Sequence, residues 1–271
     1  MNIRLVATDL DDTLLRNDRT LSKRVIRAIY QAREQGVHVT FATGRMPAST
    51  RPYVEQLGID VPIITYNGAM IQEALSGEVL YRKVIPVEIA REVVDWLLSQ
   101  GSHLHVYRQD QVFVHKMNSW SREYSRAIRV PVEEMDLLRL LEQEEEGAEK
   151  ILMFGENKAL EAWGERIREK FSGQVHITRS KPHFLEIIHP EVNKGVALTA
   201  LAKRLEIGQD EVMAIGDNLN DLEMIRYAGL GVAIGNARQE VKDVANAVTT
   251  SNEDDGVAQA IEQYVLKGRA E

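Results

Sequence analysis

The chain has 271 residues, of which 44% are apolar and 27% are charged, and its formal net charge is −8. This composition suits a globular protein of one large or two medium domains. The acidic balance disfavours a nucleic-acid partner, which needs a basic patch or stripe. The absence of cysteine excludes disulfides, thiolate catalysis and cysteine-based zinc sites. No apolar run reaches membrane-spanning length, so we expect no membrane partner and a cytoplasmic location.

The first third of the chain alternates strands and helices. We predict strands at 3–8, 37–42 and 62–66, and helices at 22–35 and 47–57. Ser22 is a favoured N-cap residue, and Gly36 is a typical helix stop. Asn67-Gly68 and Ser76-Gly77 predict tight turns. The βαβαβ order predicts a parallel sheet with right-handed crossovers.

The pattern changes after Val84, where strand pairs are interspersed with helices. We predict helices at 86–99, 119–128, 136–143 and 158–171, and strands at 103–107, 111–116, 151–154, 174–178 and 184–188. This pattern favours a separate α+β domain with a mainly antiparallel sheet. The acidic run 142–149 is typical of a solvated helix end and loop.

Parallel α/β character returns at Asn193. We predict helices at 194–205, 219–227, 239–245 and 254–266, and strands at 211–215, 231–234 and 247–249. The fold class is therefore α/β, with a second domain inserted into the first. We place the core domain at residues 1–84 plus 187–271 and the inserted domain at 85–186.

Three acids, Asp9, Asp11 and Asp12, follow the first predicted strand directly. Open α/β sheets bind ligands outside the carboxyl ends of their strands. Three carboxylates this close together repel one another unless a cation lies among them, and such hard oxygen ligands suit Mg²⁺. The motif predicts a magnesium-dependent site with a carboxylate nucleophile, although strands followed by acids are also common elsewhere.

Three further elements lie at strand ends or helix starts. The segment 43–45, Thr-Gly-Arg, offers a hydroxyl, a glycine amide and a helix N-terminus, which together favour an anion. Lys194 begins a helix, where the macrodipole disfavours a cation unless an anion lies nearby. The segment 217–221 has four Asp or Asn residues in five positions, more than one helix cap requires.

Each element alone also has a purely structural interpretation: 43–45 as a strand-to-helix turn, 217–221 as a helix cap, and Lys194 as an exposed lysine. Together they supply a nucleophile, a second acid, a metal set, a hydroxyl and a cation that can converge on one crevice. These are the parts that a phosphoryl-transfer site needs.

This set resembles the haloacid dehalogenase (HAD) superfamily of phosphohydrolases. The resemblance rests on Asp9-Leu10-Asp11-Asp12-Thr13, Thr43, Lys194 and the segment 216–221, and it covers essentially the whole chain. About thirty residues separate Asp12 from Thr43, which leaves no room for a cap domain there. The large insertion between Thr43 and Lys194 is similar to that of Cof-type, subclass IIB, sugar-phosphate phosphatases. The resemblance implies a Rossmann-like HAD core with an inserted α+β cap domain of the C2B type.

The resemblance also implies catalytic and metal-binding roles. Asp9 would attack phosphorus and form an aspartyl-phosphate, and Asp11 would protonate the leaving group and then activate water. Mg²⁺ would be held by Asp9, Asp217 and the backbone carbonyl of Asp11.

The remaining implied roles concern the substrate. The residues implied to bind phosphate are Leu10, Thr43, Gly44, Lys194 and Asn220. Asp221 would hold Lys194 or a metal-bound water. Arg45 is a weaker candidate for contacting the substrate itself.

Three functions remain open at this point. The leading one is a hydrolase of small phosphomonoesters, such as sugar phosphates, with a phosphorylated metabolite as its small-molecule partner. A phosphomutase of the same superfamily would use the same motifs. A sugar-phosphate sensor without turnover is disfavoured by the intact Asp9 and Asp11. We expect a monomer or a weak homodimer.

Overall fold

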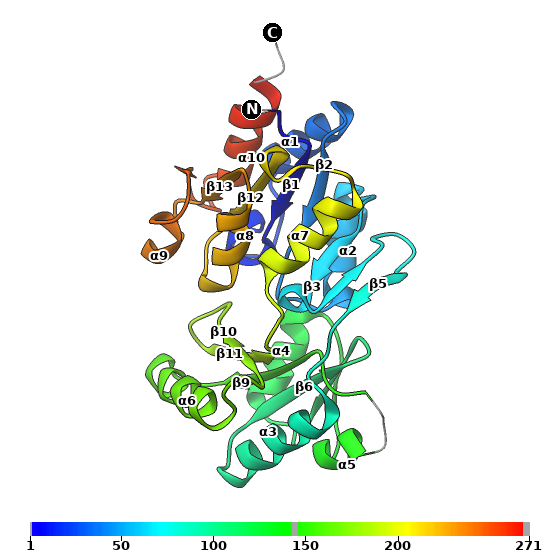
Figure 1. The fold of residues 1–271 in the computed structure, drawn as a ribbon, viewed down its shortest axis with the longest axis vertical. Coiled ribbons are helices and arrows are strands. Elements are labelled where there is room, and N and C mark those ends of the chain that lie inside the picture. Colours follow the sequence, from blue (N-terminus) through cyan, green and yellow to red (C-terminus); the bar gives the residue numbers. More distant parts are fainter. Residues whose placement is uncertain (1, 143–145, 268–271) are drawn as a thin grey trace. The chain divides into compact units, whose positions relative to one another are not determined.

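The structure is a computed structural model that describes residues 2–142 and 146–267 (Figure 1). Residues 143–145, which belong to the predicted acidic run 142–149, and the last four residues of the predicted core lie outside the described residues. The chain divides into two compact units. The first comprises Met1–Arg45, Arg51–Tyr81 and Asn193–Glu271, and the second comprises Met46–Thr50 and Arg82–Val192.

The first unit is built on a five-stranded sheet in the order β14-β13-β12-β1-β2. Its strands are β1 (Leu5–Thr8), β2 (His38–Phe41), β12 (Val212–Gly216), β13 (Leu230–Ala233) and β14 (Ala247–Val248). All four pairings are parallel, which confirms the predicted parallel sheet. The carboxyl ends of β1 and β12 are therefore neighbours at one edge.

Helices surround this sheet. They are α1 (Lys23–Glu34), α2 (Pro47–Leu57), α7 (Lys194–Arg204), α8 (Leu222–Tyr227), α9 (Gln239–Lys242) and α10 (Gly256–Ile261). Helix α7 packs on α8, in front of the sheet in Figure 1, and α1 packs on α10. Short 3-10 or π-type turns lie at Leu10–Leu14, Tyr66–Gly68, Gln209–Glu211, Leu219–Asp221 and Glu262–Leu266. The predicted helices 219–227 and 254–266 are thus each divided into two pieces.

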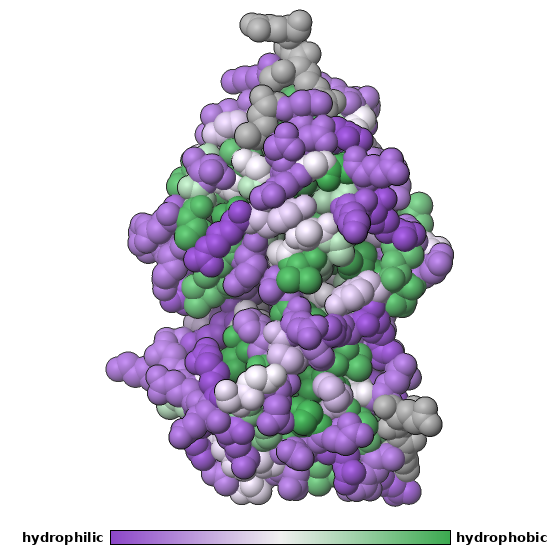
Figure 2. Space-filling model, viewed as in Figure 1, coloured by the Kyte–Doolittle hydropathy of each residue, from purple (hydrophilic) through white to green (hydrophobic). Residues whose placement is uncertain are grey.

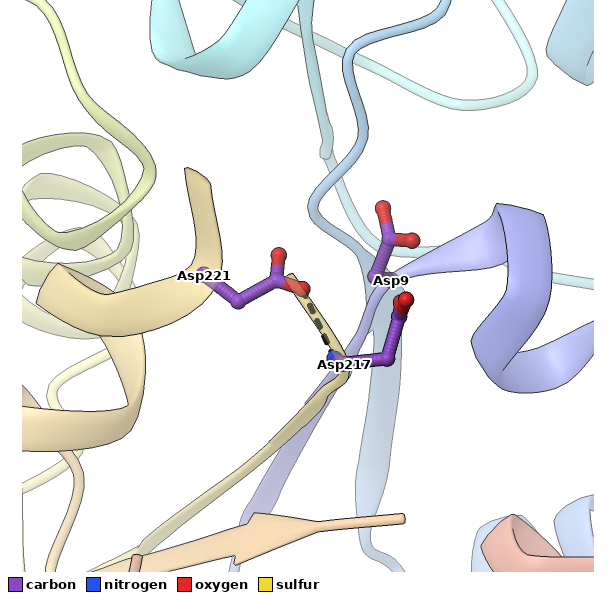
Figure 3. A group of neighbouring side chains, drawn as sticks. All are labelled: Asp9, Asp217 and Asp221. Carbon is purple, nitrogen blue, oxygen red and sulfur yellow. Dashed lines mark hydrogen bonds between the residues drawn. The ribbon is translucent and has the colours of Figure 1, made fainter. Parts of the chain in front are cut away.

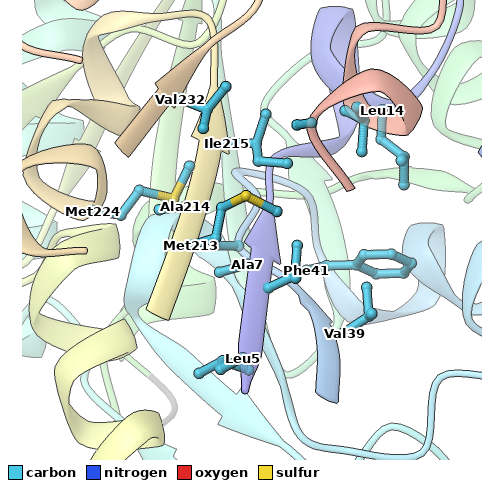
Figure 4. Close-up of a cluster of buried hydrophobic side chains, with 14 of the residues drawn as sticks. Leu5, Ala7, Leu14, Val39, Phe41, Met213, Ala214, Ile215, Met224 and Val232 are labelled. Carbon is cyan, nitrogen blue, oxygen red and sulfur yellow. The ribbon is translucent and has the colours of Figure 1, made fainter. Parts of the chain in front are cut away.

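The hydrophobic core of the first unit surrounds β1, an interior strand in which every residue is buried. Figure 4 shows Leu5 and Ala7 of this strand beside Phe41 and Ile215 of its two neighbours. A strand that is covered on both faces needs a continuous apolar run, which is the pattern of the sequence here. Each such side chain stabilises the fold by about 1.5–3 kcal/mol when fully buried.

A small three-stranded sheet follows, made of β3 (Ile63–Thr65), β4 (Met70–Gln72) and β5 (Val79–Arg82), in which β3 and β4 are antiparallel. The turn predicted at Asn67-Gly68 does connect β3 to β4, but it is wider than a two-residue turn because Thr65 pairs with Met70. The backbone in between is left-handed, with φ of +51° at Tyr66, +58° at Asn67 and +103° at Gly68.

The second unit contains a six-stranded sheet in the order β10-β11-β9-β6-β7-β8. Its strands are β6 (Leu104–Arg108), β7 (Gln111–Val114), β8 (Val132–Glu134), β9 (Lys150–Phe154), β10 (His176–Thr178) and β11 (Phe184–Ile188), and its helices are α3 (Val87–Ser99), α4 (Ser119–Ile128), α5 (Leu137–Glu142) and α6 (Asn157–Lys170). Only the β7–β8 pairing is parallel among the described strand pairs of this sheet, which confirms the predicted mainly antiparallel sheet. Strand β8 was not predicted, because it is short and two of its three residues are exposed glutamates.

Hydrophilic side chains cover most of the face drawn in Figure 2, and hydrophobic ones form small groups among them. This distribution is typical of a chain that buries its apolar residues. No helix in the described ranges is long and apolar enough to cross a membrane.

Candidate active site

Asp9 and Asp217 extend from the ends of two neighbouring strands. The amide of Asp9 donates to the carbonyl of Ile215 at 3.0 Å, which continues the β1–β12 ladder to the edge of the sheet. Figure 3 shows the carboxylates of Asp9, Asp217 and Asp221 gathered in one place. One carboxylate oxygen from each of the three lies within 4.8 Å of the others, and all three residues are buried. The fold therefore brings together three of the predicted site residues.

Lys194 lies between two of these acids. Its Nζ donates to Asp9 Oδ1 at 2.6 Å and to Asp221 Oδ1 at 2.5 Å, and the residue is fully buried. Burial disfavours the charged ammonium, but the carboxylates of Asp221 and Asp9 outweigh burial and raise the pKa of Lys194 above its usual range. The cation predicted at this helix start thus has anionic partners, as its position requires.

Asp221 is engaged through both of its carboxylate oxygens. Oδ2 accepts a hydrogen bond from the backbone amide of Asp217 at 2.9 Å, drawn as a dashed line in Figure 3. Oδ2 also accepts a hydrogen bond from the backbone amide of Asn218 at 3.0 Å, and Oδ1 contacts Lys194. Gly216 permits this approach, since a Cβ there would lie 2.6 Å from the Asp221 carboxyl carbon. Asp221 therefore holds Lys194 and the strand end, which leaves Asp9 and Asp217 as the acids best placed to hold a metal.

Replacing Gly216 with alanine is expected to displace the Asp221 carboxylate, because the added methyl group has no space. We predict a lower melting temperature and a loss of most activity. The matched control is Gly164→Ala in α6, where a Cβ would have contacts of 3.4 Å or more and the melting temperature should hold or rise. Equal effects of the two substitutions on activity would contradict this account.

Asp217 is oriented by Thr13, whose Oγ1 donates to Asp217 Oδ1 at 2.6 Å. Burial, with the charges of Asp221 and Asp9, raises the pKa of Asp217 well above its usual value, against the Thr13 hydrogen bond. Burial likewise raises the pKa of Asp9 to about 7, against the opposing charge of Lys194. A cation between the two carboxylates would favour their ionised forms, and this oxygen donor set fits a hard divalent ion.

Asp11 and Arg45 form a bidentate pair. Arg45 Nε donates to Asp11 Oδ2 at 2.6 Å, and Arg45 Nη2 donates to Asp11 Oδ1 at 2.9 Å. The guanidinium also lies over the ring of Tyr53, 5.1 Å from its centre. Burial opposes its charge, yet the contact with Asp11 raises the pKa of Arg45. Arg45 is thus held by Asp11 here, and its predicted contact with substrate stays a prediction.

Apart from Lys194, the predicted phosphate-binding residues fall in three segments of the first unit. Leu10 follows Asp9 with its side chain in the core. Thr43 is buried, and its hydroxyl accepts a hydrogen bond from the amide of Arg45 at 3.1 Å. Gly44 and Asn220 both approach Asn67, which accepts a hydrogen bond from Asn220 Nδ2 at 3.0 Å.

Sequence reasoning missed two residues that support the site, Thr13 and Asn67. Thr13 directly follows the acids of the motif 9–13, so its hydroxyl could have been predicted to contact a carboxylate of the site. The sequence predicts a turn at Asn67, and no signal in it pairs this residue with Asn220.

Comparison with known proteins decides the family. The sequence model of the haloacid dehalogenase-like hydrolases matches residues 6–261. The chain belongs to this family. A Bacillus subtilis 5-amino-6-(5-phospho-D-ribitylamino)uracil phosphatase is 30% identical over 268 residues, or 96% of this chain and 97% of that protein. Membership of the HAD superfamily and activity as a phosphatase, both predicted, are confirmed.

Solved structures of HAD-like proteins share the fold. A crystal structure from Thermotoga maritima has a TM-score of 0.82 at 32% identity, and covers 96% of this chain and 97% of that one. The HAD subclass IIB sugar phosphatase BT4131 has a TM-score of 0.85 at 23% identity, and covers 96% of this chain and 98% of that one. At that identity the likeness shows the fold alone, and it confirms the predicted α/β core with an inserted α+β cap.

Proposed function

We propose that this HAD phosphatase hydrolyses small phosphomonoesters, such as sugar phosphates or similar metabolites, through an aspartyl-phosphate on Asp9 with Mg²⁺ as cofactor. The observation that carries the proposal is the contact of Lys194 with both Asp9 and Asp221, beside the carboxylate of Asp217. This arrangement holds a buried nucleophile and a buried cation together at the end of the central strands.

Asp9 would attack phosphorus through a carboxylate oxygen, forming an O–P bond while the bond to the leaving oxygen breaks. Lys194 orients this carboxylate and offsets the charge of the phosphoryl group. Asp9, Asp217 and the backbone carbonyl of Asp11 would hold Mg²⁺, which when bound supplies positive charge to the phosphoryl oxygens.

Asp11 would donate its proton to the leaving oxygen and then accept a proton from the water that hydrolyses the intermediate. Its bidentate contact with Arg45 favours the ionised carboxylate, which is the form needed in the second step. The first step needs the protonated form, so this contact has to loosen when substrate binds.

The substrate class is supported by the relatives. The relative at 30% identity is named for 5-amino-6-(5-phospho-D-ribitylamino)uracil, which is a small phosphorylated metabolite. We assign catalysis to the core, residues 1–84 plus 187–271, and discrimination of the leaving group to the insertion, residues 85–186. A cytoplasmic monomer or weak homodimer is part of the same proposal.

A screen for phosphate release tests this function. The protein with Mg²⁺ would be incubated with sugar phosphates, nucleotides, pyridoxal phosphate and flavin mononucleotide, without an acceptor alcohol. We expect inorganic phosphate from at least one sugar phosphate or similar metabolite. Isomerised product without phosphate release would indicate a mutase, and binding without turnover would indicate a sensor.

Mg²⁺ is expected to stabilise the protein more at high pH than at low pH. Because the folded pKa of Asp9 is raised from 3.8 to about 7, the metal-free fold holds a proton that the unfolded chain releases, and its stability falls as pH rises across that window. Mg²⁺ has to displace this proton, so its gain in melting temperature should be larger at about pH 8 than at about pH 5.5. Asp217→Asn should remove most of the gain, and a gain independent of pH would contradict the assignment.

A further inference from the structure

Asn67 connects two segments of the phosphate site and has no role in the mechanism above. Its backbone amide donates a hydrogen bond to the carbonyl of Thr43 at 2.9 Å, and its side-chain Oδ1 accepts a hydrogen bond from Asn220 Nδ2 at 3.0 Å. The residue is 1% exposed. Gly44 packs so closely that a Cβ there would lie 2.9 Å from Asn67 Oδ1. Asn67 thus bridges the loops after β2 and β12.

The backbone at Asn67 is fixed in an uncommon conformation. Tyr66, Asn67 and Gly68 all have positive φ, and a tyrosine there is a true outlier. The amide of Tyr66 donates to the carbonyl of Arg45 at 2.9 Å, and a Cβ on Gly68 would lie 2.4 Å from the carbonyl oxygen of Asn193. Such strain persists where the surroundings determine it, and it clusters at functional sites.

The hydrogen bond to Asn67 sets the orientation of the Asn220 carboxamide. This hydrogen bond uses one of the two protons of Asn220 Nδ2, and the other proton can still be donated to a ligand. Asn220 Oδ1 is buried and has no hydrogen-bond partner within the part of the chain that the structure describes. A buried acceptor of this kind is costly unless a ligand satisfies it. A protonated phosphoryl oxygen or a bound water supplies that donor, and an unprotonated phosphoryl oxygen accepts the second Nδ2 proton.

We propose that Asn67 is a positioning residue for phosphate binding, which acts by holding the carboxamide of Asn220 in the orientation that receives a phosphoryl group. This inference rests on the proposed function for its ligand class. Because Asn67 Oδ1 accepts a hydrogen bond from Asn220 Nδ2, the Asn220 carboxamide cannot rotate by 180°. Asn220 Oδ1 and the second Nδ2 proton then remain available to the ligand.

The test variant is Asn67→Gly, because glycine adopts φ of +58° readily and the change removes the side chain while the backbone amide can still donate to Thr43. Phosphate affinity would be measured by calorimetry with inorganic phosphate and Mg²⁺, alongside kcat and KM for the best substrate. We expect phosphate binding and kcat/KM to fall about tenfold, as for one lost well-placed hydrogen bond to a charged group.

A double-mutant cycle separates positioning from a structural role. Because Asn67 acts through Asn220, Asn67→Gly combined with Asn220→Ala should bind phosphate no more weakly than Asn220→Ala alone. The control is Asn246→Gly, which removes a side-chain acceptor for the amide of Gly231 and should affect melting temperature without affecting phosphate affinity. Additive losses, or wild-type phosphate affinity in Asn67→Gly, would overturn the inference.

The calorimetric readout also keeps this inference separate from the proposed function. A protein that releases no phosphate from any ester, yet binds inorganic phosphate in an Asn67-dependent way, would contradict the hydrolase and support the positioning role. Normal hydrolysis by the wild type, together with unchanged phosphate affinity in Asn67→Gly, would support the hydrolase and contradict the positioning role.

Discussion

Asp9→Asn is expected to abolish turnover while the fold survives. The amide that replaces the carboxylate cannot attack phosphorus, and it is a weaker ligand for a divalent cation. The folded state should tolerate the change, because Lys194 keeps its ion pair with Asp221 and asparagine has nearly the same shape as aspartate. We expect kcat to fall by at least about a thousandfold, with a melting temperature near that of the wild type.

The matched control is Asp12→Asn in the same loop. Asp12 is an acid without an assigned role, and its φ of +60° suits asparagine well. It should retain most of the activity. If Asp9→Asn kept more than a few per cent of the wild-type rate, the covalent mechanism would be wrong.

Lys194→Met is expected to lower both activity and stability. Removing one partner of a buried ion pair leaves an uncompensated charge and typically costs about 3–5 kcal/mol in the free energy of unfolding. Here two buried carboxylates, Asp9 and Asp221, lose their cation. Activity should fall further than stability explains, because the lysine also offsets the phosphoryl group of the substrate.

The loss of stability in Lys194→Met has a predictable pH dependence. The charge of Lys194 lowers the pKa of Asp9, so without the ammonium the folded-state pKa of Asp9 rises further and a proton neutralises Asp9 at low pH. The difference from wild type in urea unfolding should therefore be smaller at about pH 5.5 than at about pH 8. Lys203→Met, at an exposed position of α7, should change little. A Lys194→Met protein that melts early yet turns over normally would show that the lysine is only structural.

The parts of the site that the sequence predicts are those determined locally. Asp9 follows a buried apolar run, and Asp217 follows another, so each is placed at a strand end by the pattern of its own segment. Parallel strands then bring their carboxyl ends to one edge, and the convergence follows from the fold class. The helix limits were predictable for the same reason, since Ser22 caps α1 through a hydrogen bond from the amide of Val25.

The parts that the sequence does not predict depend on contacts between distant segments. The hydrogen bonds from Thr13 to Asp217 and from Asn220 to Asn67 join residues that are far apart in the sequence, and residue type alone does not predict these partners. The contact between Arg45 and Asp11 is similar, because an arginine after a strand suits a substrate as well as a carboxylate. Local pattern also misses Tyr66, whose left-handed backbone is fixed by its surroundings and not by its own preference.

The central claim, that Asp9 becomes phosphorylated, is tested most directly by trapping the intermediate. The enzyme would be quenched during turnover of its best substrate and treated with borohydride, which reduces an acyl phosphate to an alcohol and so converts the aspartate to homoserine. Peptide mass spectrometry would then locate the change. The account predicts homoserine at position 9, dependent on substrate and Mg²⁺, and an unmodified Asp9 when substrate is left out. Turnover with an unmodified Asp9, or phosphate on another side chain, would contradict it.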